Sequence, residues 1–229
     1  PVYEKIIKRI EQLMIEKQQR YARLPEMLLP WYAQNARQLP WRNDKEPYHI
    51  WLSEIMLQQT RVEAVKGYYR RFLQQLPDIA ALAAAPEDVM LKLWEGLGYY
   101  SRVRNLQKAA QMIMEQHGGV FPADYEAIRA LPGIGDYTAG AIAAICFDAP
   151  TPAVDGNVLR VISRFTENFA NILAPAVKKE IAANLAAVYP RGEEAYTFNQ
   201  SLMELGATVC VPNGAPKCDI CPLQRWCLA

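Results

Sequence analysis

Four of the five cysteines in this chain gather in its last twenty residues, where their spacing could hold a metal centre. Segments of seven, two and five residues separate Cys210, Cys218, Cys221 and Cys227. Clustered cysteines in a chain without an export signal bind a metal more often than they pair as disulfides. Zinc usually takes two CxxC pairs or histidines, and neither His49 nor His117 is nearby in the sequence. A single CxxC pair flanked by two further cysteines favours a 4Fe-4S cluster, with zinc second and disulfides last.

A glycine-containing turn in the segment LPGIGDYT, at residues 131–138, could bind a phosphate group. Gly133 and Gly135 are two residues apart, and both can adopt a positive φ and let a partner approach the backbone closely. Asp136 then opens a segment in which apolar residues recur at helical spacing. Because the first N–H groups of a helix point outward from its N-terminus, this turn predicts a phosphate-binding site.

Two carboxylates stand in unusual sequence surroundings. Glu54 lies in the middle of the apolar segment 48–59, where apolar neighbours would raise the pKa of its carboxyl group. The simpler interpretation is a glutamate on the one solvated face of a helix. Asp155 stands among small residues and precedes a Gly-Asn pair, which by itself indicates a turn and a helix N-cap.

The cysteines, glycines and carboxylates named above lie on predicted helices or in the segments between them. Apolar residues recur at helical spacing through most of the chain, and alternating strand patterns bounded by turns are absent. We therefore predict an all-α fold, in which the isolated Cys146 packs in the core of an apolar helix. The expected helices span residues 3–18, 25–38, 48–59, 62–76, 86–94, 102–116, 122–130, 136–147, 158–165, 175–188 and 194–209.

Composition places the chain among ordinary globular proteins. It has 51% hydrophobic and 21% charged residues over 229 positions, enough for one domain or two small ones. The formal net charge is only +1, so any DNA-binding face must be local. Charged or amide residues interrupt every long apolar run, and the N-terminal residues lack a signal peptide's apolar core. We therefore expect a cytoplasmic protein, associated with the nucleoid if the source is bacterial.

Several motifs together resemble one family. The hairpin LPGIGDYTA, the aspartate about twenty residues later and the four-cysteine segment are similar to the helix-hairpin-helix glycosylase superfamily that includes endonuclease III. Within it, the chain resembles the adenine DNA glycosylases, which remove adenine mispaired with 8-oxoguanine. The segments that carry this closer resemblance are PWR at 40–42, SEIMLQQTRV at 53–62, WEGLGYYSRVRN at 94–105 and VDGNVLR at 154–160.

The resemblance implies a monomer with two lobes. A helical barrel with the hairpin would span residues 36–142, and an iron–sulfur cluster lobe would combine residues 1–35 with 143–229. The partner would be double-stranded DNA containing adenine opposite 8-oxoguanine or guanine. The family usually carries a further Nudix-like domain, so we expect this sequence to be the catalytic region alone. Its first cysteine gap is seven residues where the family usually has six, which predicts a bulged turn around Gly214.

The resemblance also assigns roles in removing the base. Glu54 would protonate the leaving adenine, and Asp155 would either stabilise the sugar as it becomes an oxocarbenium ion or bond to it transiently. Tyr137 stands where endonuclease III-like enzymes carry a lysine that forms a Schiff base, and a tyrosine cannot form an imine with the sugar. We therefore expect a monofunctional glycosylase that leaves the strand intact, with Tyr137 and Asn157 orienting Asp155, the sugar or a water.

Further residues would hold the DNA. By the same resemblance, Gly133 and Gly135 would bind its backbone, and Gln59 and Tyr99 would enter the helix beside the flipped base. An adenine pocket would be lined by Trp41, Arg42, Leu57, Val62 and Gln200. Basic residues on helices are often simply solvated, but here the candidate phosphate contacts are Arg61, Arg102, Arg104 and Lys108.

Two other functions fit the same pattern of residues. A glycosylase directed at thymine or another pyrimidine would share the fold and most of the motifs. A non-catalytic, structure-specific DNA-binding module would share the hairpin but not the need for Asp155. Release of a different base would identify the first, and unchanged activity after Asp155→Asn would identify the second.

Overall fold

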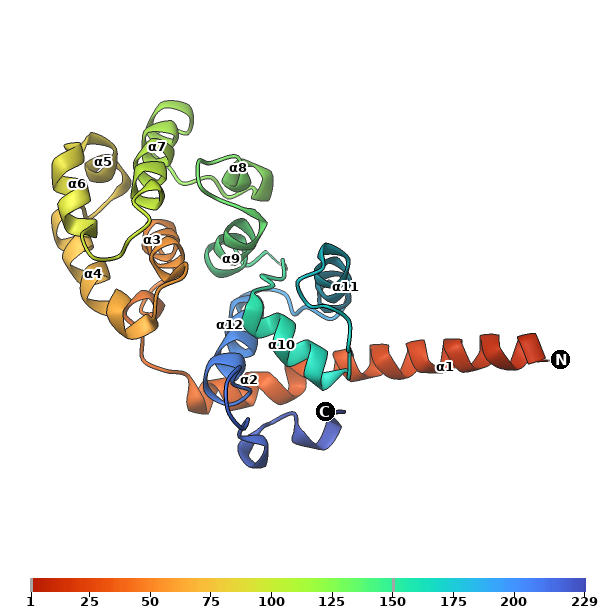
Figure 1. Ribbon diagram of the computed structural model, residues 1–229. Helices are drawn as coiled ribbons and strands as arrows, with labels where there is room; N and C mark the ends of the chain where they lie inside the picture. The colour runs from red at the N-terminus through yellow and green to blue at the C-terminus, as the bar shows by residue number, and fades with distance from the viewer. Residues whose placement is uncertain (1, 150) are drawn as a thin grey trace. The chain divides into compact units, whose positions relative to one another are not determined.

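The computed structural model of this protein describes residues 2–149 and 151–229. Every regular element in those two ranges is helical, so the all-α prediction is confirmed (Figure 1). The chain separates into two compact units. We call Gln38–Phe147 the hairpin unit, and Pro1–Arg37 together with Asp148–Ala229 the cysteine unit. Within the described residues, none of the helices combines the length and apolarity that a membrane crossing requires.

The hairpin unit is built from short helices that follow one another closely along the chain. Its elements are η1 (Pro40–Arg42), α3 (Pro47–Leu57), α4 (Val62–Gln75), α5 (Ile79–Ala84), α6 (Glu87–Trp94), α7 (Ser101–Gln116), α8 (Tyr125–Arg129) and α9 (Asp136–Cys146). The helix α3 is its centre: η1, α4 and α9 all pack against it. Eight of the eleven residues of α3 are buried, as expected for a helix that is apolar on all sides.

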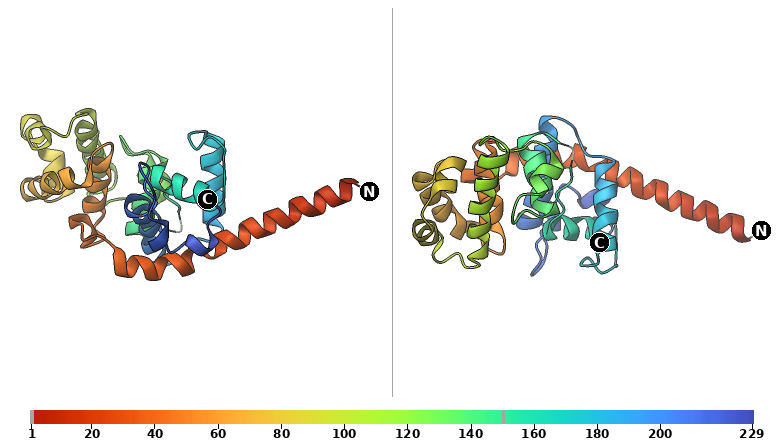
Figure 2. Two further views of the ribbon diagram at one scale, coloured as in Figure 1. Left: turned by 60° about the horizontal axis from the view of Figure 1, so that its bottom comes forward. Right: turned by 90° about the horizontal axis from the view of Figure 1, so that it is seen from above.

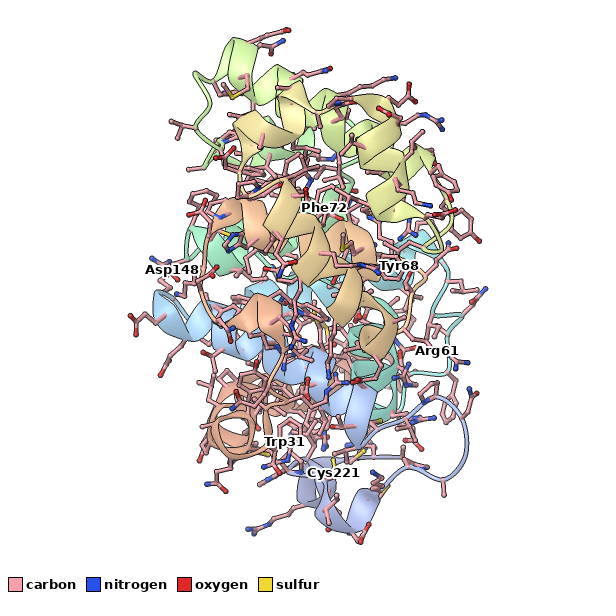
Figure 3. All side chains as sticks on the ribbon, turned by 90° about the vertical axis from the view of Figure 1, so that its left-hand side faces the viewer. Trp31, Arg61, Tyr68, Phe72, Asp148 and Cys221 are labelled. Atoms are coloured by element: carbon pink, nitrogen blue, oxygen red, sulfur yellow. The ribbon has the colours of Figure 1, made fainter. Side chains whose placement is uncertain are left out.

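Aromatic side chains tie the outer helices of this unit to its centre. Trp51 of α3 meets Phe121 edge to face with ring centroids 5.5 Å apart. Phe72 of α4, labelled in Figure 3, meets Trp94 of α6 at 6.0 Å. Such buried aromatic pairs add about 0.5–1.5 kcal/mol each beyond their buried area. The first pair joins α3 to the segment before α8, and the second joins α4 to α6.

The cysteine unit combines elements from both ends of the chain. They are α1 (Val2–Ala22), α2 (Leu24–Asn35), α10 (Gly156–Phe165), α11 (Pro175–Ala186), α12 (Glu193–Thr208), η2 (Cys218–Ile220) and η3 (Gln224–Trp226). The helix α12 packs against both α2 and α10, and their apolar faces form the core. In both views of Figure 2 the N-terminal part of α1 extends away from the other helices of this unit, and its Tyr3, Ile6 and Met14 side chains are exposed.

The structure differs from the predicted helices in a few places. The sequence analysis missed α5, a six-residue helix between two prolines, because so short a segment has no helical period to detect. The signal was its N-cap: Asp78 accepts a hydrogen bond from the Ala81 N–H at 2.7 Å. The predicted helix 122–130 shortens to α8 because Asp124 caps it, accepting from the N–H groups of Glu126 and Ala127.

The predicted divisions between lobes fell after residues 35 and 142. The two units instead divide after Arg37 and after Phe147. A division after residue 142 would cut α9, which is continuous and almost wholly buried. A buried helix belongs with the core that covers it, so all of α9 stays in the hairpin unit.

Candidate active-site residues and the cysteine cavity

Asp155 is the N-cap of α10, so the N-cap interpretation of this aspartate is confirmed. Its Oδ1 accepts a hydrogen bond from the Val158 N–H at 2.8 Å. Its Oδ2 accepts one from Asn157 Nδ2, also at 2.8 Å. Both oxygens are therefore held, and the positive end of the helix dipole favours the negative charge of the carboxylate. The side chain remains half-buried, which leaves it accessible to a reactant.

A second layer of hydrogen bonds holds Asn157. Its Oδ1 accepts from Arg160 Nη2 at 2.8 Å, and that same nitrogen donates to the Gly206 carbonyl of α12 at 2.8 Å. Arg160 Nε donates to the Cys210 carbonyl at 2.9 Å. Burial lowers the pKa of Arg160, although an arginine keeps its charge in proteins. The aspartate is thus joined through two side chains to the backbone of the first clustered cysteine.

The segment that leads into Asp155 is fixed from α12. The Ala153 N–H donates to Asn199 Oδ1 at 3.2 Å, and both residues are buried. Gln200, the next residue on α12, is also buried, with 8% of its surface exposed. The candidate pocket residue Gln200 and the candidate catalytic Asp155 therefore belong to the same unit.

Glu54 lies on α3 with 8% of its surface exposed, in the midst of buried apolar residues. The interpretation of Glu54 as a residue on a solvated helix face is therefore wrong. Burial strongly raises the pKa of the Cys146 thiol at the end of α9, and the negative charge of Glu46 raises it further. Cys146 itself is only partly buried, so it lies at the edge of the core rather than inside it.

Four candidate pocket residues come from elements that pack together in the hairpin unit. Trp41 and Arg42 form most of η1, Leu57 ends α3 and Val62 begins α4. The segment η1 contacts both helices, and the buried Trp41 ring meets Tyr69 edge to face at 5.6 Å. The structure therefore packs together the three elements that carry these four residues.

Gln59 and Tyr99 share an unusual backbone conformation. Their φ angles are +56° and +47°, in the left-handed region that residues other than glycine seldom adopt. Both side chains are exposed, and Tyr99 shows 64% of its surface. Strained, exposed residues of this kind are common where a protein contacts a ligand.

The helical hairpin consists of α8, the turn 130–135 and α9. Gly133 has the predicted positive φ, +80°, and a Cβ there would lie 2.8 Å from the Asn105 Cβ. The same prediction for Gly135 is wrong: its φ of −97° is in the extended region, where it forms the N-cap of α9. No neighbouring atom lies within 4 Å of a Cβ built at Gly135, so its backbone is open to a partner. Tyr137 follows, half-buried, in the first turn of α9.

All four clustered cysteines line one cavity of about 220 Å³ in the cysteine unit. Arg164 adjoins it, donating from Nη1 to Cys210 Sγ at 3.3 Å, and Cys221 is labelled in Figure 3. The Lys217 N–H donates to the Val209 carbonyl at 3.0 Å and closes the long cysteine gap, in which Gly214 has a φ of +79°. The chain bends at Gly214 within this gap, and the accommodation of the seventh residue by a bulge there stays a prediction.

The four cysteines of the cavity are the side chains that would hold a metal centre. Among the described residues, no three metal-ligating side chains lie close enough together to hold one metal ion. A cubane cluster places each thiolate on a different iron and so keeps the sulfurs further apart than one zinc would. The pKa of the Cys221 thiol is raised to about 11, chiefly by burial and to a smaller extent by the three other cysteines.

Comparison with known proteins agrees with this geometry. The family model described as "HhH-GPD superfamily base excision DNA repair protein" matches residues 52–186. The chain belongs to the HhH-GPD superfamily. The match runs from the segment that contains Glu54 to the end of α11 and includes the hairpin and Asp155.

Relatives and solved structures of similar sequence or fold support this placement. The chain is 46% identical to adenine DNA glycosylase of Mus musculus over 211 residues, covering 88% of this chain and 41% of that protein. It is 41% identical to adenine DNA glycosylase of Buchnera aphidicola subsp. Baizongia pistaciae over 203 residues, covering 88% and 57%. The chain thus spans about half the length of the curated relatives it matches.

Two solved structures share the fold. That of a thermostable thymine-DNA glycosylase superposes with a TM-score of 0.81 at 28% identity, covering 92% of this chain and 96% of that one. A trapped covalent complex of endonuclease III with DNA superposes at 0.76 and 24% identity, covering 93% and 95%. The all-helical architecture of the HhH-GPD superfamily therefore extends over nearly the whole chain.

The four predicted phosphate contacts differ in their exposure and in the groups that they contact. Arg61, labelled in Figure 3, and Lys108 are exposed. Arg104 is exposed and pairs with Glu87, with 2.9 Å between Nε and Oε1. Arg102 is wrongly assigned, because its guanidinium is turned inward and donates to backbone carbonyls. An arginine used in this way cannot contact phosphate.

Sequence reasoning did not find three residues of this HhH-GPD chain that hold the candidate site. Arg160 and Gly206 contact Asn157, and Asn199 accepts a hydrogen bond from the Ala153 N–H in the segment that leads into Asp155. For Arg160 the motif VDGNVLR was a usable signal. Asn199 and Gly206 lie on α12, and only the packing of α12 brings them close to α10 and the segment before it.

Proposed function

We propose that this chain is the catalytic region of an adenine DNA glycosylase, which hydrolyses the N-glycosidic bond of adenine opposite 8-oxoguanine or guanine in double-stranded DNA. The observation that carries the proposal is the carboxylate of Asp155, fixed through both oxygens at the N-terminus of α10. The names of the relatives at 46% and 41% identity support adenine as the base that is removed.

The chemistry needs a proton for the departing base and negative charge beside the sugar. Glu54, buried on an apolar helix, donates its proton to a ring nitrogen of adenine. The electron pair of the bond between sugar and base then leaves with the adenine. Asp155 stabilises the resulting oxocarbenium ion until a water adds to it, and the proton that this water releases restores the acid form of Glu54. The products are free adenine and an abasic site.

Tyr137 limits the reaction to one bond. A glycosylase that also cleaves the strand uses an amine to form a Schiff base with the sugar, and a phenol cannot do so. We infer a monofunctional enzyme in which Tyr137 packs at the start of α9 and Asn157 fixes Asp155. The abasic product would keep both strands intact until alkali or another enzyme acts on it.

The remaining candidate residues would bind the substrate. The N-terminus of α9, with the open backbone of Gly135 and the turn at Gly133, would bind a DNA phosphate. Gln59 and Tyr99 would fill the space left by the flipped adenine, as exposed side chains on strained turns. The adenine itself would contact Trp41, Arg42, Leu57, Val62 and Gln200.

We propose that Cys210, Cys218, Cys221 and Cys227 hold a 4Fe-4S cluster in their common cavity. When bound, the cluster supplies a rigid centre for the C-terminal segment, since hydrolysis itself requires no electron transfer. Purified protein should be brown and contain iron and sulfide in equal amounts, about four of each per chain. A colourless protein with one zinc per chain would contradict the assignment.

The deciding experiment measures base release from duplexes that place adenine opposite 8-oxoguanine, guanine or thymine, and from a guanine–thymine duplex. We expect release of adenine from the first two, and strand breaks only after alkali. Release of thymine from a guanine–thymine duplex, without release of adenine, would favour a relative of the thymine-DNA glycosylase that shares this fold. Strand breaks without alkali would contradict the role given to Tyr137.

A substitution separates an enzyme from a DNA-binding module. Asp155→Asn keeps a side chain that can cap α10 but removes the negative charge. We expect base release to be lost while binding to the same duplex persists. Unchanged activity in that variant would reject the proposed reaction.

A further inference from the structure

Arg102 joins two segments of the hairpin unit that lie far apart in the sequence. It stands in the first turn of α7, and its guanidinium group points inward. One nitrogen, Nη1, donates to carbonyls at the end of α3, and the other, Nη2, donates to carbonyls of the turn before α7. The acceptors and distances are Ile55 at 3.0 Å, Met56 at 3.3 Å, Gln58 at 2.5 Å, Leu97 at 2.9 Å and Gly98 at 3.1 Å.

These acceptors explain why an arginine is required. The last carbonyls of a helix have no partner within the helix and carry the negative end of its dipole. A guanidinium group satisfies carbonyls on both of its edges at once, whereas the ammonium group of a lysine is a single point. Arg102 also lies over the rings of Trp94 and Tyr99, at 5.4 and 5.6 Å from their centroids.

Each of the two bridged segments contains an exposed residue with left-handed backbone, Gln59 in one and Tyr99 in the other. Gln59 directly follows the Gln58 carbonyl, and Tyr99 directly follows the Gly98 carbonyl, both of which Arg102 binds. Left-handed backbone at such residues is unfavourable by about 1–3 kcal/mol and persists only where the surroundings enforce it. The guanidinium group provides that constraint at the same point in both turns.

We propose that Arg102 is a positioning residue that fixes Gln59 and Tyr99 relative to each other, so that both can enter the DNA together. The inference rests on the proposed function, because it assigns a purpose to two residues that would contact DNA. Arg102 itself touches no substrate. Its effect passes through the carbonyls of Gln58 and Gly98.

The first test measures hydrogen exchange in the full chain without DNA. In Arg102→Lys, exchange should rise in both bridged segments, where the Gln58, Thr60 and Leu97 N–H groups are bonded to nearby carbonyls. The variant Arg70→Lys, at an exposed position of α4, is the matched control and should exchange like the wild type. Faster exchange in one segment alone, or in neither, would contradict the proposal that Arg102 fixes both segments.

The second test compares base release from two substrates in single turnovers. Flipping is least unfavourable when the base has no partner, so adenine opposite an abasic site needs little help from inserted side chains. Arg102→Lys should slow release from the adenine:8-oxoguanine duplex by roughly ten- to a hundredfold, and from the abasic-partner duplex much less. An equal loss on both substrates would indicate a general structural defect and overturn the proposal.

The two tests also separate this inference from the proposed function. If the wild type releases no adenine from either duplex, the proposed function fails and the insertion role of Arg102 fails with it. The exchange experiment still decides whether Arg102 bridges the two turns. If the wild type is active and both substrates respond as described, both statements stand.

Discussion

The backbone of Gly206 on α12 lies directly against the side chain of Asn157 on α10. A Cβ at Gly206 would be 2.6 Å from the Asn157 Cβ and 3.1 Å from its Cα. No side chain fits at that distance, so α12 can approach α10 this closely only at a glycine. The contact matters because Asn157 donates to Asp155 Oδ2.

We predict that Gly206→Ala displaces Asn157 and slows adenine release. Overpacking of this kind lowers the free energy of unfolding by about 1–3 kcal/mol. The matched control is Gly67→Ala on α4, where a Cβ meets no atom within 4 Å. Alanine is favoured over glycine in a helix by about 1 kcal/mol, so this control should be more stable and equally active. Urea unfolding measures the stability of both variants, and single-turnover kinetics measures their adenine release. A Gly206→Ala variant that is more stable than the wild type and fully active would refute the role of the contact between Gly206 and Asn157.

We predict that Asn199→Ala loosens the segment that leads into Asp155. The buried Ala153 N–H would lose its acceptor, at a cost of about 1–3 kcal/mol in stability. Release of adenine should slow while DNA affinity stays close to that of the wild type. Asn168→Ala is the control, since Asn168 accepts from the Ala170 N–H at 2.9 Å in an exposed turn where water can replace it. Equal effects of the two substitutions would argue against a specific role for Asn199.

The positions of Asp155 and Gly133 were predictable because their signals are local. An aspartate before a Gly-Asn pair indicates an N-cap, and a glycine in a tight turn indicates a positive φ, whatever surrounds them. The conformation of Gly135 was mispredicted because an N-cap glycine also suits extended backbone. A pattern of residue types cannot distinguish these two uses of glycine.

The role of Arg102 could not be predicted because its partners are remote. Its acceptors are backbone carbonyls up to 47 residues away, and carbonyls carry no sequence signal. The pattern of residue types along a helix does not show whether one arginine side chain points into the protein or toward solvent. The roles of Gly206 and Asn199 could not be predicted for the same reason. Gly206 contacts α10, Asn199 contacts the segment that leads into it, and both contacts depend on how α12 packs.

We predict that stability falls at alkaline pH and that Tyr189 contributes to the fall. Burial raises the pKa of Tyr189 well above its usual value of 10, and its hydroxyl has no hydrogen-bond partner among the described residues. Above pH 10 the unfolded chain releases this proton while the folded chain keeps it, so the free energy of unfolding decreases as pH rises.

Tyr189→Phe should therefore weaken the alkaline loss and raise stability at pH 7 by about 1 kcal/mol. Tyr48→Phe is the contrasting variant, because the Tyr48 hydroxyl donates to the Leu76 carbonyl at 2.8 Å in the core. Its removal should destabilise the protein at pH 7 by about 1–3 kcal/mol. Urea unfolding at about pH 7, 10 and 11 measures both effects, and a less stable Tyr189→Phe at pH 7 would contradict the unpaired hydroxyl.

The last prediction concerns Glu54 as the proton donor. Glu54→Gln keeps the size of the side chain but cannot supply a proton, so adenine release should slow by about a hundredfold or more while the fold and DNA affinity persist. Glu63→Gln is the control, since Glu63 is exposed on α4 and pairs with Lys66 at 2.7 Å. A substrate whose base leaves readily without protonation should rescue Glu54→Gln but not Asp155→Asn, because the sugar still needs its negative charge. If Glu54→Gln slowed the release of adenine and of this readily leaving base equally, Glu54 would serve something other than proton transfer.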